Sequence, residues 1–288
     1  MQSVCVGVIG GSGLYSVEGL SNVDTVWPDT PFGRPSDEIV TGELDGVRVA
    51  FLPRHARGHT ISPSELPARA NIWALKALGV THVISISAVG SLRQELAPRD
   101  IVIPDQIIDR TKGIRPASFF GQGIVVHVAF AEPFCPVLSN IVYQAGIEAG
   151  AHMHLGGTMV VMEGPQFSTR GESFLYRQIG GDLVGMTALP EAKLAREAEL
   201  CYCTVAMVTD YDCWHEVEEG VTVEMVIANM QANVENAKRI VRGSLPRIAA
   251  TDRNCGCGSA LAGAIMTARD KMPAERVELL RPLIGKYL

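Results

Sequence analysis

The chain has 288 residues, 47% of them apolar and 19% charged, and this balance excludes a disordered or low-complexity protein. The 25 basic and 31 acidic residues leave a net charge of −6, which argues against nucleic acid as a partner. Because no uncharged, dominantly apolar run reaches about 18 residues, the sequence predicts no membrane-spanning helix and no membrane partner.

The first 17 residues contain an apolar run that leads directly into glycines. They lack the basic start of a secretory signal, so they predict a first strand and its turn. The seven cysteines are an odd number, scattered along the chain. Without an export signal they predict thiols in a reducing compartment, the cytoplasm.

Short apolar runs recur along the chain, with helical stretches between them. Their β-branched, nearly continuous character is typical of strands in a sheet buried on both faces. The predicted strands cover residues 4–10, 49–53, 82–90, 100–104, 158–164, 182–187 and 203–210. The predicted helices cover residues 65–79, 190–199 and 222–244.

This alternation predicts an α/β fold, with a central, mostly parallel, mixed twisted sheet flanked by helices. We expect residues 1–288 to form a single domain, with 250–288 as a helical tail that lies at a subunit interface. Ligands bind beyond the carboxyl ends of the strands in such sheets. The polar residues that follow each apolar run are therefore the candidate site residues.

The first two strands are followed by turns suited to an anion. Gly10, Gly11, Ser12 and Gly13 form a turn whose backbone can approach a phosphate, although a plain tight turn is an equal interpretation. The loop 53–59 holds Arg54, His55 and a second Arg–His pair. Guanidinium groups match phosphate oxygens in a fork geometry, so we favour oxyanion binding over a solvated basic turn.

The ends of later strands contribute small residues, hydroxyl groups, a methionine and an aromatic residue to the candidate site. Ser87 and Ala88 lie in a small-residue loop, and Met186 and Thr187 close a later strand. Phe167 lies in a Gly-Pro loop, where an aromatic residue is more often an anchor than a ligand platform.

Asp210 and Asp212 follow a very apolar strand, two residues apart. They should point the same way if the extended chain continues, although a helix cap or an Asx turn is an alternative. Burial should raise the pKa of Asp210.

These strand ends together predict a bound phosphate beside a flat, nitrogen-bearing ring. No HExxH, paired CxxC or aspartate-rich metal motif occurs, and no GxSxG nucleophile turn. Neither a metal nor a cofactor is therefore expected.

A series of motifs in the same order carries a family resemblance. The segments are IGGSGLY (9–15), DTPFGRPSD (29–37), PRHARGHTISPS (53–64), ANIWALK (70–76), SAVGSL (87–92), DQIIDRT (105–111), AEPFCP (131–136), MEGPQFSTR (162–170), GMTALPEAKLAREAE (185–199) and VTDYDCW (208–214). The chain resembles the trimeric purine nucleoside phosphorylases, in the branch that acts on 5′-methylthioadenosine. The resemblance implies a homotrimer that cleaves this nucleoside with inorganic phosphate as co-substrate and no cofactor.

The resemblance also implies roles for individual residues. The phosphate site comprises Ser12, Arg54, His55, Ser87, Ala88 and Thr187. Phe167 and Met186 contact the base and ribose, and Asp210 and Asp212 bind adenine at N7 and the 6-amino group. Val223 and Val226 line the 5′-alkylthio pocket, and His127 is donated to the neighbouring subunit's 5′ pocket.

Other interpretations remain open. The same chemistry could act on adenosine, inosine or guanosine, although 6-oxopurines would favour an Asn in place of an acidic base reader. A nicotinamide-dependent dehydrogenase or a non-catalytic nucleoside-binding protein would not need the cationic loop.

Cys255 and Cys257 form a CxC pair in the tail. It resembles an element that forms disulfides in some thermostable relatives. Two free thiols is the simpler interpretation here, and two ligands alone do not predict a metal site.

Overall fold

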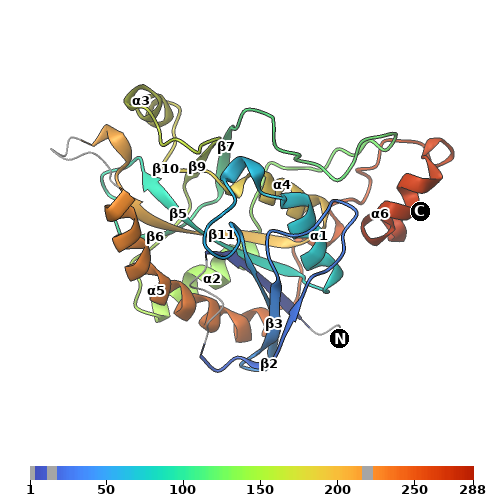
Figure 1. Ribbon diagram of the computed structural model, residues 1–288, viewed down its shortest axis with the longest axis horizontal. Coiled ribbons are helices and arrows are strands. Elements are labelled where there is room, and N and C mark those ends of the chain that lie inside the picture. The colour runs from blue at the N-terminus through green and yellow to red at the C-terminus, as the bar shows by residue number, and fades with distance from the viewer. Residues whose placement is uncertain (1–3, 12–17, 216–222) are drawn as a thin grey trace.

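The computed structural model describes residues 4–11, 18–215 and 223–288 (Figure 1). Its strands join in one sheet of mixed direction, as the sequence predicts. They are β1 (Cys5–Gly10), β2 (Ser21–Val26), β3 (Ile39–Leu44), β4 (Val47–Pro53), β5 (His82–Ser91), β6 (Ile101–Ile103), β7 (Gln106–Arg110), β8 (Met153–Leu155), β9 (Thr158–Met162), β10 (Leu183–Gly185) and β11 (Cys201–Asp210).

The sheet divides around β5. The main path runs β2-β3-β4-β1-β5-β10-β9-β7, while β11 pairs with β5 from His82 to Gly90 and leads to β6 and β8. The central pairs β4·β1, β1·β5 and β5·β11 are all parallel, so their carboxyl ends lie at one edge.

Six helices flank this sheet in the described part of the chain. They are α1 (Ala68–Ala77), α2 (Pro136–Glu148), α3 (Arg170–Gln178), α4 (Ala188–Glu197), α5 (Val223–Ala250) and α6 (Ala274–Ile284). Helices α2 and α5 pack on one face, and α1 and α4 pack on the other (Figure 1). No helix of residues 4–11, 18–215 or 223–288 is both long and apolar enough to cross a membrane.

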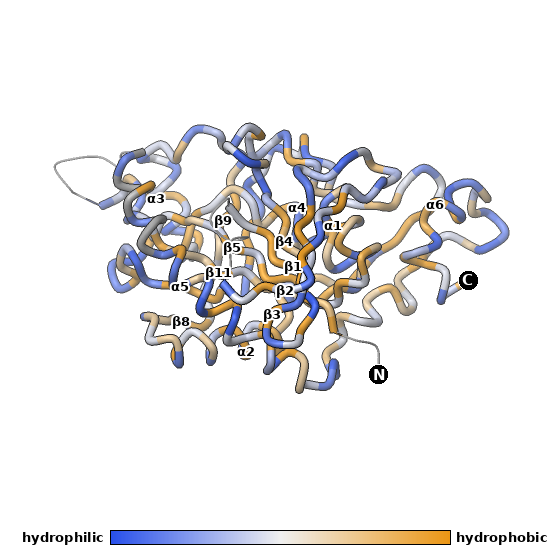
Figure 2. Tube along the Cα trace, turned by 60° about the horizontal axis from the view of Figure 1, so that its bottom comes forward, coloured by the Kyte–Doolittle hydropathy of each residue, from blue (hydrophilic) through white to orange (hydrophobic). Residues whose placement is uncertain are grey.

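The alternation of side chains along the strands produces two cores. In β1, Cys5 and Ile9 point to the face of α1 and α4, while Val6 and Val8 point to the face of α2 and α5. Both sets are buried, which explains why the strand is apolar throughout. The hydrophobic central strands and the more hydrophilic periphery are visible in Figure 2.

The seven predicted strands and three predicted helices are confirmed, with ends that differ by a few residues, except that the long helix α5 continues to Ala250. The sequence analysis missed four strands and two helices, which are β2, β3, β7, β8, α2 and α3. Helix α6 lies within the predicted helical tail, 250–288.

Part of the segment that follows α5 packs against the core. Leu261, Leu280 and Ile284 are fully buried, and they belong to the core on the α1 and α4 side. Lys286 Nζ lies 2.5 Å from a carboxylate oxygen of Glu199. The loop before α2 pairs with this segment through an antiparallel bridge between Val126 and Ile265. Helix α6 and the C-terminus lie at one end of the molecule (Figure 1).

Glu197, at the end of α4, is buried and accepts hydrogen bonds from Ser118 Oγ and the Phe119 amide, both at 2.7 Å. Burial raises the pKa of Glu197 from 4.5 to about 7. The folded protein therefore keeps this proton at pH values where the unfolded chain has released it. The stability that this group contributes is full below pH 4.5 and is lost as the pH rises to about 7.

Glu197→Gln is expected to remove this loss, because the amide stays neutral at every pH. At pH 8 the variant should exceed the parent protein in unfolding free energy by up to about 3 kcal/mol, with little difference at pH 5. Urea unfolding at the two pH values tests this, with Glu235→Gln on an exposed helical surface as control. Equal gains at both pH values would show that the proton is not the cause.

Candidate active site

A cavity of about 540 Å³ opens where the central strands end. Residues at or just beyond the carboxyl ends of β1, β4, β9, β10 and β11 and in the last part of β5 line it, and α5 closes one side. The position agrees with the general rule for ligand sites in such sheets. The cavity brings together most of the site residues predicted from the sequence: Arg54, His55, Ser87, Ala88, Phe167, Met186, Thr187, Asp210 and Asp212.

One part of the cavity is rich in hydroxyl groups. Ser87, near the end of β5, and Thr187, at the start of α4, are both buried, and their oxygens lie 3.0 Å apart. Thr187 occupies the N-cap position, but its side chain makes no capping bond. Both hydroxyls can donate to an anion, and the start of α4 beside Thr187 favours negative charge.

Arg54 differs from the sequence-based expectation. Its guanidinium is buried and pairs with Glu191, with Nε 2.5 Å from Oε1. Further hydrogen bonds go from Nη2 to Ser85 Oγ and Glu191 Oε2, and from Nη1 to the Ile86 carbonyl. The predicted fork toward a phosphate is therefore wrong, because the fork is used within the protein. Arg54 retains its positive charge and one Nη1 hydrogen for a ligand.

We expect His55 to be neutral at pH 7. Burial lowers the pKa of His55 to about 4. Its Nδ1 lies 2.8 Å from the carbonyl oxygen of Ile61, which can only accept, so Nδ1 carries the hydrogen. Nε2 is then an acceptor. The ring stacks on His59 at a centroid distance of 4.3 Å, which fixes its plane.

Asp210 ends β11 at a bulge, because the register with β5 shifts between Val208 and Asp210. Its Oδ2 accepts a hydrogen bond from Thr209 Oγ1 at 2.7 Å, and its Oδ1 accepts one from the Asp212 amide at 2.8 Å. The side chain is buried, and burial raises the pKa of Asp210, as predicted from the sequence. Such a carboxyl group is suited to exchanging a proton with a ligand.

Asp212 does not continue the extended chain, so the predicted strand-like alignment of the two carboxylates is wrong. It begins a short 3₁₀ turn (Asp212–Trp214) with φ of +49°. It nevertheless lines the same cavity. Its Oδ2 is buried and makes no hydrogen bond of normal geometry with the described residues. Burial raises the pKa of Asp212, although Ser173 and Ser168 lie close enough to lower it in part. A buried acceptor of this kind is available to a ligand.

Gly90 makes room for both carboxylates. A Cβ at this position would lie 3.1 Å from Asp210 Oδ1 and 3.3 Å from Asp212 Cβ. Gly90 pairs directly with Asp210 across β5 and β11. A Cβ at Gly90 would therefore press on Asp210 itself, and a movement elsewhere in the protein could not relieve the contact.

Gly90→Ala is expected to displace Asp210 and lower kcat/KM by about 10–10²-fold, because small misplacements of a reacting group are costly. Gly171→Ala in α3 is the matched control, since a Cβ there would meet nothing within 4 Å. Full activity of Gly90→Ala in steady-state kinetics would contradict the tight placement of Asp210.

The remaining walls are apolar. Met186 and Phe167 line the cavity, and Phe167 remains 54% exposed at its rim. Ile227 and Val234 of α5 also contribute, although the sequence analysis did not name them. They lie four and eleven residues after Val223, on the same side of a helix. Only the backbones of Val223 and Val226 are described, and Ser12 lies outside the described residues.

His127 does not line the cavity of its own chain. It is exposed, on the loop that pairs with the tail, and its amide donates to the Ala264 carbonyl at 2.9 Å. This placement leaves the side chain free to contact another molecule.

A buried pair that the sequence analysis did not identify supports the Met186 loop. Arg115 Nε donates to Glu163 Oε1 at 2.7 Å, and Nη1 donates to the carbonyls of Met186 and Leu189. These bonds join the loop after β9 to the loop after β10. Nothing local in the sequence marks Arg115, because its partners lie 48 or more residues away.

These features define a nucleoside-phosphorylase-like site, and the chain belongs to the phosphorylase superfamily, whose family model matches residues 6–246. It is 56% identical over 283 residues to the S-methyl-5′-thioadenosine phosphorylase of Geobacter sulfurreducens, covering 98% of this chain and 99% of that protein. Identity to the enzyme of the same name from Chloroflexus aurantiacus is 58% over 289 residues, covering 100% and 99% of the two chains. The family and fold class expected from the motifs are thus confirmed.

Solved structures agree. A methylthioadenosine phosphorylase sourced from an antarctic soil metagenomic library superposes with a TM-score of 0.93 at 48% identity, covering 98% of this chain and 99% of that chain. The methylthioadenosine phosphorylase from Schistosoma mansoni in complex with adenine gives 0.85 at 38% identity, covering 91% and 99%.

Proposed function

We propose that the protein catalyses the phosphorolysis of 5′-methylthioadenosine to adenine and 5-methylthioribose 1-phosphate, a purine and methionine salvage reaction. The observation that carries this proposal is that one cavity is lined by buried hydroxyls, by His55 and by two buried carboxylates. Enzymes with this activity in their names match the chain over nearly its whole length at 56–58% identity.

The phosphate is assigned to Ser87, Ala88, Thr187, His55 and the remaining hydrogen of Arg54. Hydroxyl and guanidinium hydrogens donate to its oxygens, and Nε2 of neutral His55 accepts the hydrogen that a phosphate monohydrogen dianion carries. A phosphate oxygen then attacks C1′ as the C1′–N9 bond breaks. The nearby negative charge stabilises the positive charge that develops on the ribose.

Asp210 is assigned to the leaving base. The electrons of the broken bond pass to the purine, which becomes a good leaving group when N7 receives or shares a proton. A buried carboxyl group with a raised pKa retains that proton more readily than an ordinary aspartate.

Asp212 is assigned to the recognition of adenine. Its unpaired Oδ2 accepts from the 6-amino group. A 6-oxopurine would place two acceptors face to face, at a cost of about 1–3 kcal/mol.

The 5′ substituent is assigned to the apolar side of the cavity. Ile227 and Val234 of α5 support this assignment. It extends to Val223, about one turn before Ile227, and to Val226. A methylthio group loses little on leaving water, whereas a 5′-hydroxyl must give up its hydrogen bonds.

The active assembly is proposed to be a cytoplasmic homotrimer in which His127 reaches the 5′ pocket of the adjacent subunit. The exposed loop of His127 and its bridge to the tail support this arrangement. Light scattering should give three chains per particle, and His127→Ala should raise KM for the nucleoside while leaving KM for phosphate unchanged.

The deciding assay measures release of the free base from 5′-methylthioadenosine, adenosine and inosine, each as a separate substrate. Release should require orthophosphate, and kcat/KM should be highest for the methylthio substrate and lowest for inosine. Equal release after orthophosphate has been removed enzymatically would contradict phosphorolysis, and faster cleavage of inosine would contradict the role of Asp212.

A further inference from the structure

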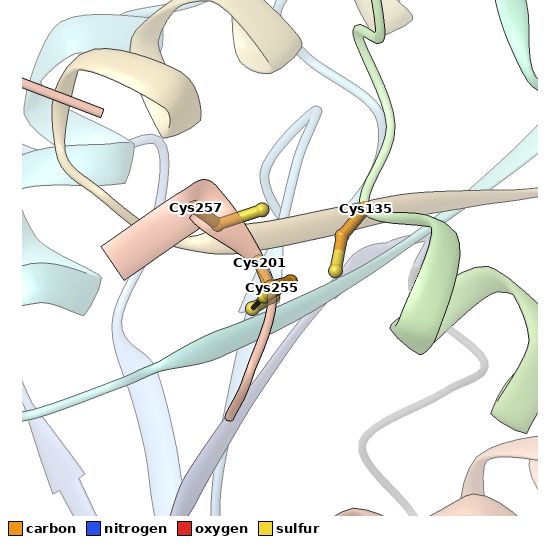
Figure 3. Close-up of side chains that lie close together, drawn as sticks. All are labelled: Cys135, Cys201, Cys255 and Cys257. Atoms are coloured by element: carbon orange, nitrogen blue, oxygen red, sulfur yellow. Dashed lines mark hydrogen bonds between the residues drawn. The ribbon is translucent and has the colours of Figure 1, made fainter. Parts of the chain in front are cut away.

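Four cysteines that are distant in sequence meet at one place. Cys135 precedes α2, Cys201 begins β11, and Cys255 and Cys257 lie on the segment that follows α5 (Figure 3). Their four sulfur atoms all lie within 4.8 Å of one another, and those of Cys201 and Cys255 are 3.4 Å apart. Three of the side chains are buried, and Cys255 is half-buried.

The spacing of the sulfurs suits a tetrahedral metal ion. Zinc binds thiolates at about 2.3 Å, which places the sulfurs of a tetrahedral site about 3.8 Å apart. The observed contact of 3.4 Å and the limit of 4.8 Å lie on either side of this value. A disulfide would instead require two sulfurs at about 2.05 Å, and would use them in pairs.

Cationic groups surround the cluster. Arg253 Nε lies 3.2 Å from the sulfur of Cys201 as a donor, and the positive charge of Arg196 acts on Cys257. Four thiolates and a divalent ion carry a net charge of −2, which these guanidinium groups offset. N–H donors to ligating sulfurs are also the usual second layer of such sites.

We propose that Cys135, Cys201, Cys255 and Cys257 bind one Zn²⁺ ion in a closed tetrahedral site. Four Zn–S bonds form, and each thiol that is protonated beforehand releases its proton to solvent, with no change of oxidation state. A site with four protein ligands leaves no position for substrate, so it is structural. It joins the segment after α5 to the sheet and to the start of α2.

The site is remote from the cavity. Cys201 begins β11 and Asp210 ends it, so the two are separated by roughly 30 Å at about 3.3 Å per residue. Removal of the metal should therefore lower stability and leave the chemistry of the cavity unchanged. Sequence motifs did not reveal the site, because Cys135 and Cys201 lie 54 or more residues from the CxC pair.

The test is elemental analysis of protein purified anaerobically without a metal-binding tag. The parent protein should hold about one zinc ion per chain. Cys255→Ser/Cys257→Ser should hold none and should melt about 5–10 °C lower. Cys5→Ala, which removes a buried thiol outside the cluster, should keep the zinc.

Cobalt substitution provides a second measurement that does not depend on folding of the double variant. Metal-stripped parent protein should take up one Co²⁺ per chain, with the intense visible absorption of a tetrahedral thiolate complex. A parent protein that is metal-free, with the four sulfurs as thiols or in disulfides, and that gives no such spectrum would overturn the proposal.

Discussion

Asp210→Ala is expected to lower kcat for adenine release by about 10²–10⁴-fold, the range that a positioned acid contributes. The variant removes the buried carboxyl that Thr209 and the Asp212 amide hold at the end of β11. Phosphate binding should change little, because Asp210 is not among the groups assigned to the anion. Steady-state kinetics with both substrates varied measures this separation.

Asp210→Asn distinguishes proton donation from mere packing. The amide has nearly the shape of the carboxyl group, but it cannot give a proton to N7. N7 and the 6-substituent lie on the same edge of the purine, so the NH₂ group beside N7 can also donate to the O6 atom of a 6-oxopurine. The ratio of kcat/KM for 5′-methylthioadenosine over 5′-methylthioinosine should therefore fall by about 10-fold or more. Unchanged turnover in Asp210→Ala would show that the assigned role is wrong.

The second large effect is expected at Arg54. Arg54→Met leaves Glu191 as a buried carboxylate with its cationic partner removed, and this should lower the unfolding free energy by about 3–5 kcal/mol. Ser85 and Tyr202 still donate to Glu191, but neither carries a compensating charge. Urea denaturation measures the loss.

Arg54→Met/Glu191→Gln separates stability from phosphate binding. The second substitution removes the unpaired charge, so most of the lost stability should return. KM for phosphate should stay raised in both variants, because neither restores the positive charge. If the double variant were as unstable as Arg54→Met, the buried charge would not be the cause.

The sequence predicts those strands whose side chains are buried on both faces of the sheet. Strands β1, β5 and β11 are buried along nearly their whole length and are mostly apolar because both of their faces are covered, and this leaves a clear pattern. Strand β2 lies at the edge of the sheet with almost every residue exposed, so its segment SNVDTV has no apolar run to detect. Helix α3 had a usable local signal in the Thr169–Glu172 capping box.

The site was predictable where chemistry follows directly after a strand. Arg54 and Thr187 follow β4 and β10, Asp210 ends β11, and Ser87 lies in the last part of β5; all four line one cavity. Their partners were not predictable, because Glu191 reaches Arg54 across 137 residues and the conformation of Asp212 depends on the bulge in β11. Contacts between residues so far apart in the chain depend on the topology of the sheet, so no regular spacing in the sequence indicates them.

The most direct test of the account is a crystal structure of the protein with sulfate and adenine. The account predicts the anion between Ser87, Thr187 and His55, and the purine against Asp210 and Asp212, with room for a ribose between them in the same cavity. Adenine bound away from both carboxylates, or an anion bound only outside the cavity, would contradict it.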